Sequence, residues 1–196
     1  SREELAAGYM AAVALDGVLS RLWQLNVLPN GSVLSRLGHG DSDFFTQNSY
    51  RIGQKLASPI GPAAKTGPES PATDAETLKR RCQTFKHSAY LISGTAGYAG
   101  GKLRIEACLV QVATATIKPD STVAVGGELA QLPDLIAQLA AGLARKLGVT
   151  LEPDQTALLK PGLSANPDAL KQYGEACLLA AEGQADKAAA ALQQSL

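Results

Sequence analysis

The stretch GTAGYAGGKLRIEA, from Gly94 to Ala107, decides how this sequence folds. Its glycines precede a lysine, as they do in a loop that cradles a nucleotide phosphate. Such a P-loop places a glycine five positions before the second one, and a serine or threonine directly after the lysine. Here those positions hold Ala96 and Leu103, and the lysine leads into an alternating strand instead of a helix. Gly100 and Gly101 tolerate the positive φ angles of a tight turn, so the stretch predicts a β-hairpin.

The second arm of this hairpin has the clearest strand pattern in the chain. Apolar residues alternate with polar ones from Lys102 onward, which predicts one buried face and one face in water. We expect the buried face to turn towards a helix over 133–148, whose leucines form a straight stripe. The two facing surfaces are Leu103, Ile105, Ala107 and Leu109 on the strand, and Leu135, Leu139 and Leu143 on the helix.

Local signals divide the rest of the chain. They predict a helix over 1–25, a short strand over 25–28, a helix over 74–86 and a further strand over 121–129. Proline and glycine recur over 38–71, which predicts a long loop and the most mobile internal segment. Near the end, Asn166 and Pro167 begin a helix, Gly183 ends it, and a second helix follows.

These elements indicate an α/β (α+β) fold, in which a mixed β-sheet is packed by helices and followed by a C-terminal helical hairpin. The hairpin is of the tetratricopeptide-repeat (TPR) type. We expect an α/β domain over 1–150, a linker over 151–166 and the TPR-like hairpin over 167–196.

Bulk composition restricts the partners. Among 196 residues, eighteen basic side chains balance eighteen acidic ones, so no overall field attracts nucleic acid. No apolar run approaches the roughly 20 residues that span a bilayer, so no direct membrane insertion is expected. The three cysteines, Cys82, Cys108 and Cys177, are too widely spaced for a disulfide framework or a zinc site. We expect thiols, with one bridge and one free thiol as the alternative.

No combination of residues in the sequence indicates catalysis. His39 lies near Asp41 and Asp43 in a glycine-rich loop, which is typical of a solvated loop rather than a metal site. Cys82 and His87 are five positions apart and have no second pair that would complete a zinc site. We therefore predict a protein with no catalytic residue, no cofactor and no metal, and thus not an enzyme.

Protein partners are the expectation for the helical hairpin. A single two-helix unit cannot bury both of its apolar faces, because such units gain their core from stacked neighbours. Its larger apolar and aromatic side chains should therefore contact the α/β domain, another chain or further repeats, and self-association is possible. The candidate docking residues are Tyr173, Leu178, Leu179 and Leu192.

The order of these elements, together with the stretch YLISGTAGYAGGKLRIEACLVQVATATI, resembles the TolB N-terminal-like domain and its FlgO and CsgG-type relatives. The matching residues are Ser93, Gly94, Arg104, Ile105, Leu109, Val112, Ala113 and Thr114. Gly183, Ala188 and Leu192 are similar to the start of a TPR array. Two departures exist. The family domain opens with an apolar strand where this sequence begins with a helix, and Ala115 replaces a family glycine, so that turn should differ.

The resemblance implies a non-catalytic sensor or protein-interaction module of a bacterial signalling or envelope protein. An outer-membrane-associated lipoprotein scaffold is the first alternative, and a small-ligand-binding sensor with the 38–71 loop as its lid is the second. All three imply a periplasmic or extracytoplasmic location more than a cytoplasmic one, with any anchor upstream of this sequence.

Overall fold

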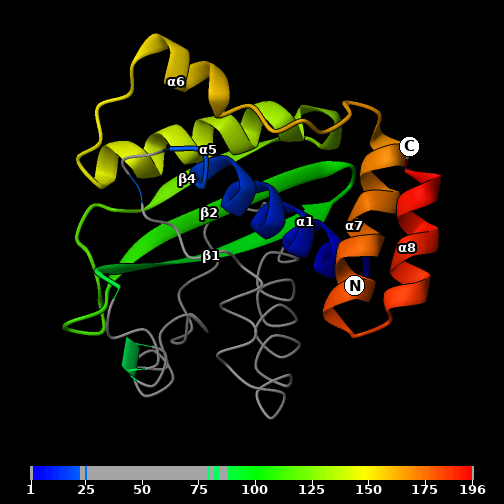
Figure 1. Ribbon diagram of the computed structural model, residues 1–196, viewed down its shortest axis with the longest axis horizontal. Helices are drawn as coiled ribbons and strands as arrows, with labels where there is room; N and C mark the ends of the chain where they lie inside the picture. Colours follow the sequence, from blue (N-terminus) through cyan, green and yellow to red (C-terminus); the bar gives the residue numbers. More distant parts are fainter. Residues whose placement is uncertain (1, 23–24, 26–78, 80–81, 84–87, 196) are drawn as a thin grey trace.

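The computed structural model describes residues 2–22, 25, 79, 82–83 and 88–195, and Figure 1 shows the arrangement of their elements. In chain order these are α1 (Arg2–Leu19), β1 (Tyr90–Ala99), β2 (Lys102–Gln111), β3 (Thr116–Ile117), β4 (Val123–Glu128), a 3₁₀ turn η3 (Leu129–Gln131), α5 (Leu132–Lys146), α6 (Pro153–Leu158), α7 (Pro167–Ala181) and α8 (Ala185–Gln194). The α/β class is thus confirmed. The loop over 38–71, residues 26–28 of the expected first strand, and most of the helix over 74–86 lie outside the described residues.

The hairpin prediction is confirmed. β1 and β2 pair antiparallel along their whole length, from Tyr90 opposite Gln111 to Ala99 opposite Lys102. The turn residues Gly100 and Gly101 have φ angles of 57° and 78°, in the region that only glycine enters without strain. The lysine after the glycines lies on the exposed side of a strand, as the hairpin interpretation requires.

β2 is the central strand of the sheet. β1 lies on one side of it, and β3 and β4 both pair with its other side. Every pairing among the described strands is antiparallel, which corrects the expected mixed sheet. The reason is local: a two-residue turn joins β1 to β2, and the link from β2 to β4 is too short for the crossover that parallel strands need.

A buried serine bridges the gap between β3 and β4. The Leu109 N–H donates to Ser121 Oγ at 3.1 Å, and that hydroxyl lies 2.7 Å from the Lys118 carbonyl, to which it donates. The Lys118 N–H in turn donates to the Leu109 carbonyl at 2.8 Å. The Ser121 side chain therefore takes the place of a ladder bond on β2 between the residues that pair with β3 and those that pair with β4.

The main core lies between one face of the sheet and helices α1 and α5. It contains the residues predicted for the facing surfaces, all of them buried: Leu103, Ile105, Ala107 and Leu109 on β2 with Leu135, Leu139 and Leu143 on α5. On β4, Val123 faces Gly142 of α5 so closely that a Cβ on this glycine would lie 2.6 Å from the valine Cγ1. α5 therefore lies directly over the β4 side of the sheet.

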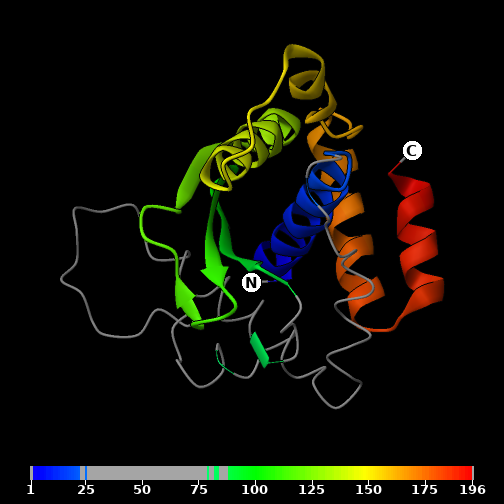
Figure 2. The same cartoon turned by 60° about the vertical axis from the view of Figure 1, so that its left-hand side comes forward.

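Helix α1 is buried on two sides. Met10 and Ala14 belong to the core that faces the sheet, whereas Ala6 and Tyr9 contact the C-terminal hairpin. Figure 2 shows α1 between the sheet and α7. This explains why apolar residues surround the whole helix instead of one stripe. The helix ends at Leu19, earlier than predicted, where Arg21 and Leu22 donate to carbonyls only three residues back.

The two helices of the C-terminal hairpin form as predicted, and a further short helix precedes them. Asn166 caps α7 by accepting the Asp168 N–H at 2.9 Å, and Gly183, with a φ of 75°, turns the chain into α8. The expected linker over 151–166 contains the short helix α6. Glu152 and Gln155 form a capping box around Pro153 in its first turn, and this stabilises a helix start.

Candidate functional site

The contact between α1 and α7 joins the α/β part of the chain to the helical hairpin. Leu178 of α7 is 3% exposed and packs against Ala6 and Tyr9. The backbones approach closely because Gly174 faces α1, and a Cβ there would lie 3.2 Å from the Ala6 carbonyl oxygen. The hairpin is therefore fixed to α1 by buried surface and is not a freely hinged appendage.

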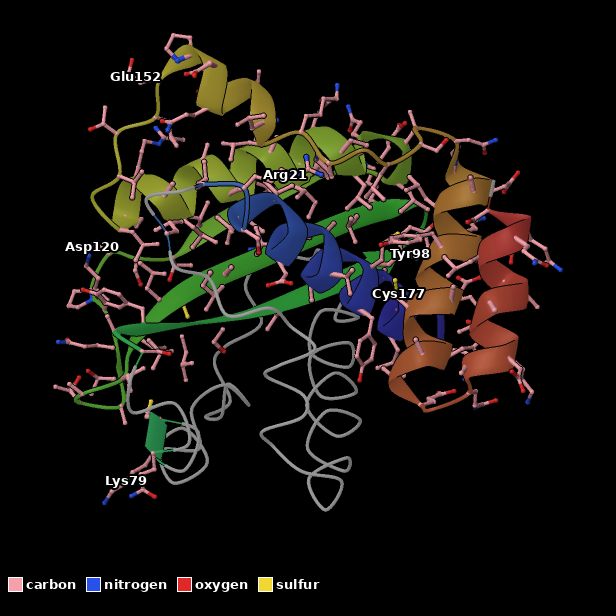
Figure 3. All side chains as sticks on the ribbon, in the orientation of Figure 1. Arg21, Lys79, Tyr98, Asp120, Glu152 and Cys177 are labelled. Atoms are coloured by element: carbon pink, nitrogen blue, oxygen red, sulfur yellow. The ribbon has the colours of Figure 1, made fainter. Side chains whose placement is uncertain are left out.

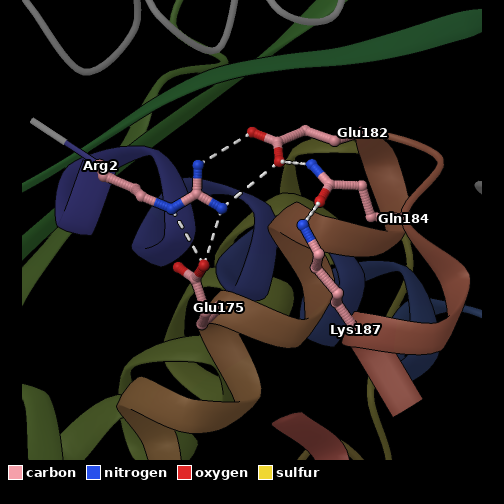
Figure 4. Close-up of polar contacts among 5 residues, drawn as sticks. All are labelled: Arg2, Glu175, Glu182, Gln184 and Lys187. Atoms are coloured by element: carbon pink, nitrogen blue, oxygen red, sulfur yellow. Dashed lines mark hydrogen bonds and ion pairs between the residues drawn. The ribbon is translucent and has the colours of Figure 1, made fainter. Parts of the chain in front are cut away.

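Arg2 connects the start of α1 to the hairpin through polar contacts, which Figure 4 shows. Its Nη2 lies 2.7 Å from Glu175 Oε1, and its Nη1 lies 3.1 Å from Glu182 Oε1. These hydrogen bonds, first to Glu175 and then to Glu182, raise the pKa of Arg2. Glu182 also accepts from Gln184, which accepts from Lys187. Half of the Arg2 side chain is exposed, so the network orients the hairpin more than it stabilises it.

A cleft of about 210 Å³ opens beside this junction. Its floor is apolar, and charged side chains stand at its rim. Glu3, Ala6, Ala7 and Met10 of α1, Tyr98 of β1, Leu129 of η3, and Leu170, Lys171, Gln172, Gly174 and Glu175 of α7 line it. Figure 3 shows Tyr98 and Cys177 where the sheet, α1 and α7 meet. The volume is below the roughly 300–1,000 Å³ of most small-molecule sites, so it fits only a small ligand.

Two of the thiols, Cys108 and Cys177, have the chemistry of inert cysteines. Burial raises the pKa of Cys177, although a hydrogen bond with Tyr173 opposes this, and burial also raises the pKa of Tyr173 to about 12. Burial and the nearby Glu106 raise the pKa of Cys108. Cys108 and Cys177 are free thiols, and Cys82 is buried. A thiol with a raised pKa is mostly protonated at neutral pH and is a poor nucleophile.

No group of three or more possible metal ligands occurs within the described part of the chain. His39, Asp41, Asp43 and His87 lie outside it. None of the helices in that part is long and apolar enough to cross a bilayer.

The four candidate docking residues occupy different environments. Tyr173 is half-buried against the main core, and Leu178 contacts α1. Leu179 is 8% exposed and packs against Ala188 and Ala191 of α8. Leu192 alone among the four is on the surface, with 43% of its area exposed.

Leu192 belongs to a wider exposed face of α8. Ala185 and Ala189 precede it at seven and three positions, which places all three on one side of the helix. The adjacent side of α8, with Ala188 and Ala191, is buried against α7. The chain therefore presents a weakly apolar helix face that nothing in the described residues covers.

Sequence reasoning missed the Arg2 network and the junction cleft. One signal was available for the network: Glu175 and Glu182 are seven positions apart, and thus two turns apart on one helix face. The cationic partner is 173 residues away from Glu175, and no local pattern identifies it.

No family model matches this chain, and comparisons with curated proteins and with solved structures find no match either.

Proposed function

We propose that this chain is a non-catalytic protein-interaction module of a bacterial signalling or envelope protein, with a TolB N-terminal-like domain and a TPR-like hairpin. The order of the described elements, with a helix, the β1–β2 hairpin, a further strand and then a helix, supports the resemblance. The turn at Ala115 was expected to differ because the family has glycine there, yet Ala115 adopts a φ of 53°, a glycine-like conformation that is compatible with the family's turn. A periplasmic or extracytoplasmic location accompanies this proposal.

One observation is the main support for the interaction role. The hairpin is held on α1 through Leu178 and Gly174, so α8 cannot turn its outer face inward. That face presents Ala185, Ala189 and Leu192, the surface on which a neighbouring helix stacks in repeat proteins. The proposed partner contact is therefore an amphipathic helix lying along α8.

Photo-crosslinking in cells tests this role. A benzoylphenylalanine at position 192 should capture discrete partner proteins, and the same probe at the exposed Thr150 should not. Ala189→Glu places a carboxylate on the same face of α8 and should abolish capture from position 192. Equal capture from positions 192 and 150, in folded protein, would contradict the proposal.

The junction cleft favours a second candidate, a sensor for a small ligand. Its apolar floor and the charges of Glu3, Lys171 and Glu175 suit a small amphipathic molecule. A thermal-shift screen should find ligands whose stabilisation disappears in Gln172→Trp, which adds bulk at the rim. A screen with no such ligand would leave the docking role as the better proposal.

The lipoprotein-scaffold alternative and the signalling role differ in the segments that the gene encodes upstream, and not in this domain. A lipobox cysteine upstream would favour the envelope scaffold. A regulator or kinase domain with a membrane helix upstream would favour signalling.

A further inference from the structure

The outer edge of β4 offers backbone groups that no described strand pairs. The Leu129 N–H donates to the Gly101 carbonyl at 3.3 Å, and this bond shows which residues of β4 direct their backbone groups towards β2. In an antiparallel ladder alternate residues direct their backbone groups to the same side. Val123 and Val125 therefore bond to β2, whereas Ala124 and Gly126 point away from it.

Among the described residues, the edge has one end that is closed by its own turn and one end that nothing covers. At the closed end the outward N–H of Glu128 donates to Gln131 Oε1 at 2.9 Å. The 3₁₀ turn η3 that follows Glu128 therefore satisfies this N–H. At the open end, Ala124 and Gly126 are exposed and small. From Val123 to Gly127 the strand carries no charge and no proline, the usual features that keep other chains off a strand edge.

A groove of about 560 Å³ runs between this open end and helix α5. Val123 and Gly142 are in close contact at its base, and the exposed side chains of Arg145 and Lys146 stand at its rim. Lys118 adds a third positive charge, since its Nζ donates to the Lys146 carbonyl at 2.6 Å. Within the described residues none of these three cations has a carboxylate partner within ion-pair distance.

Part of this positive charge stabilises the end of α5. Arg145 Nε donates to the Ala141 carbonyl at 3.3 Å, and cations at a helix C-terminus offset its negative dipole. That role uses one N–H of the guanidinium and leaves its Nη atoms for an anion. The groove thus combines an open strand edge with cations that are available for a carboxylate.

We propose that this edge binds an extended, acidic peptide segment of a partner protein, which adds a strand beside β4. Its backbone pairs with Ala124 and Gly126. The residue that lies opposite Val123 projects to the helix side of the sheet, into the groove. A carboxylate at that position meets Arg145 and Lys146, so hydrogen bonds from the edge give affinity and the cations select the sequence.

A second copy of this chain is a poorer occupant. If two β4 edges paired, the residues on the helix side would be Val123, Val125 and Gly127, and none of these carries a carboxylate. Glu128 lies on the opposite face of the sheet, away from Arg145. Charge complementarity therefore favours a partner segment over self-pairing.

The site is separate from the face of α8 proposed above. Figure 2 shows β4 and α8 on opposite sides of the molecule, with α1 and α7 between them. Substitutions at one surface can therefore be tested without changing the other.

Fluorescence anisotropy with synthetic peptides tests the proposal. The probe is a labelled, alternating Thr/Val heptapeptide with a central Asp, and the matched probe has Asn in that place. The Asp peptide should bind the intact chain about five- to tenfold more tightly at low salt, and added salt should reduce this preference. The double variant Arg145→Glu/Lys146→Glu should remove it. Lys102→Glu/Arg104→Glu, an equal charge change on the other face of the sheet, should leave it unchanged.

Two further measurements locate the peptide. Hydrogen exchange followed by NMR should show the Ala124 and Gly126 amides becoming protected when the Asp peptide is added. Ala124→Pro removes an outward N–H without removing a bond to β2, so it should weaken both peptides while the melting temperature changes little. Circular dichroism and thermal melts verify that each variant is folded.

Three results would overturn the proposal. One is equal binding of the Asp and Asn peptides, or no binding of either peptide. Another is peptide binding that leaves the Ala124 and Gly126 amides unprotected. The third is protection of those amides without peptide, rising with protein concentration alongside dimer formation in light scattering, which would assign the edge to a second copy. Loss of capture at α8 would change none of these outcomes.

Discussion

Truncating Leu178 tests whether the helical hairpin is fixed to the α/β part of the chain. This side chain is 3% exposed and fills the contact between α7 and the Ala6 and Tyr9 side of α1. Leu178→Ala removes the buried methyl groups and leaves a cavity, and buried leucine truncations cost about 2–5 kcal/mol. Its cluster is a small one at the edge of the main core, which allows partial collapse. We therefore expect a loss of about 2–3 kcal/mol, or roughly 4–12 °C in melting temperature.

Leu192→Ala is the matched control. It makes the same chemical change in the same hairpin, but 43% of Leu192 is exposed, so the loss should be below about 1 kcal/mol. Urea and thermal unfolding followed by circular dichroism measure both variants. If the two leucines cost the same, α7 does not lie on α1 in solution, and the argument for a fixed α8 face fails.

The remaining predictions concern the sheet and the one strongly shifted titration. Ile105→Asp buries an unpaired carboxylate in the core and should cost several kcal/mol, so an unchanged melting temperature would place this residue elsewhere. Gly94→Ala should destabilise the β1–β2 hairpin, because the added Cβ would lie 2.5 Å from the Glu106 carbonyl oxygen. Urea unfolding measures the loss of stability. An unchanged free energy of unfolding would contradict the β1–β2 register. The pKa of Tyr173 is raised from 10.0 to about 12, so the folded state holds this proton more tightly than the unfolded state. The protonated Tyr173 phenol therefore contributes its full stabilisation of the folded state below pH 10, and this contribution is lost as the pH rises to about 12. Tyr173→Phe should flatten that alkaline decline in urea unfolding, and an identical decline in both proteins would contradict the burial of the phenol.

Features that depend on neighbouring residues were predictable from the sequence. Gly100 and Gly101 have the positive φ angles that their turn needs, and the alternation in β2 matches the burial of its side chains. Asn166 caps α7 through a bond to a residue two positions away, and Gly183 ends it. Each of these signals lies within a few residues of the structure that it determines.

The errors arose where local signals were misread or where distant contacts decide. The segment 151–166 was expected to be a linker, and it contains the helix α6, which begins at Pro153 behind the Glu152–Gln155 capping box. The apolar pattern of α7 identified Leu178 and Leu179 as residues that must be covered. It could not specify that α1 and α8 of the same chain cover them, because α1 is more than 150 residues away along the chain.

The same reasoning explains why the sequence indicated only Leu192 of the α8 face and did not identify the β4 edge. A strand edge is open only if no other strand pairs with it, and a helix face is open only if no other element covers it. Both conditions concern the whole fold. The structure places the β4 edge and the face of α8 on opposite sides of a body whose centre is α1, buried against the sheet through Met10 and against the hairpin through Tyr9. Because α1 contacts both sides through packed side chains, it holds the two surfaces at a fixed separation. That geometry suits a module that connects two partners more than one that binds a single ligand.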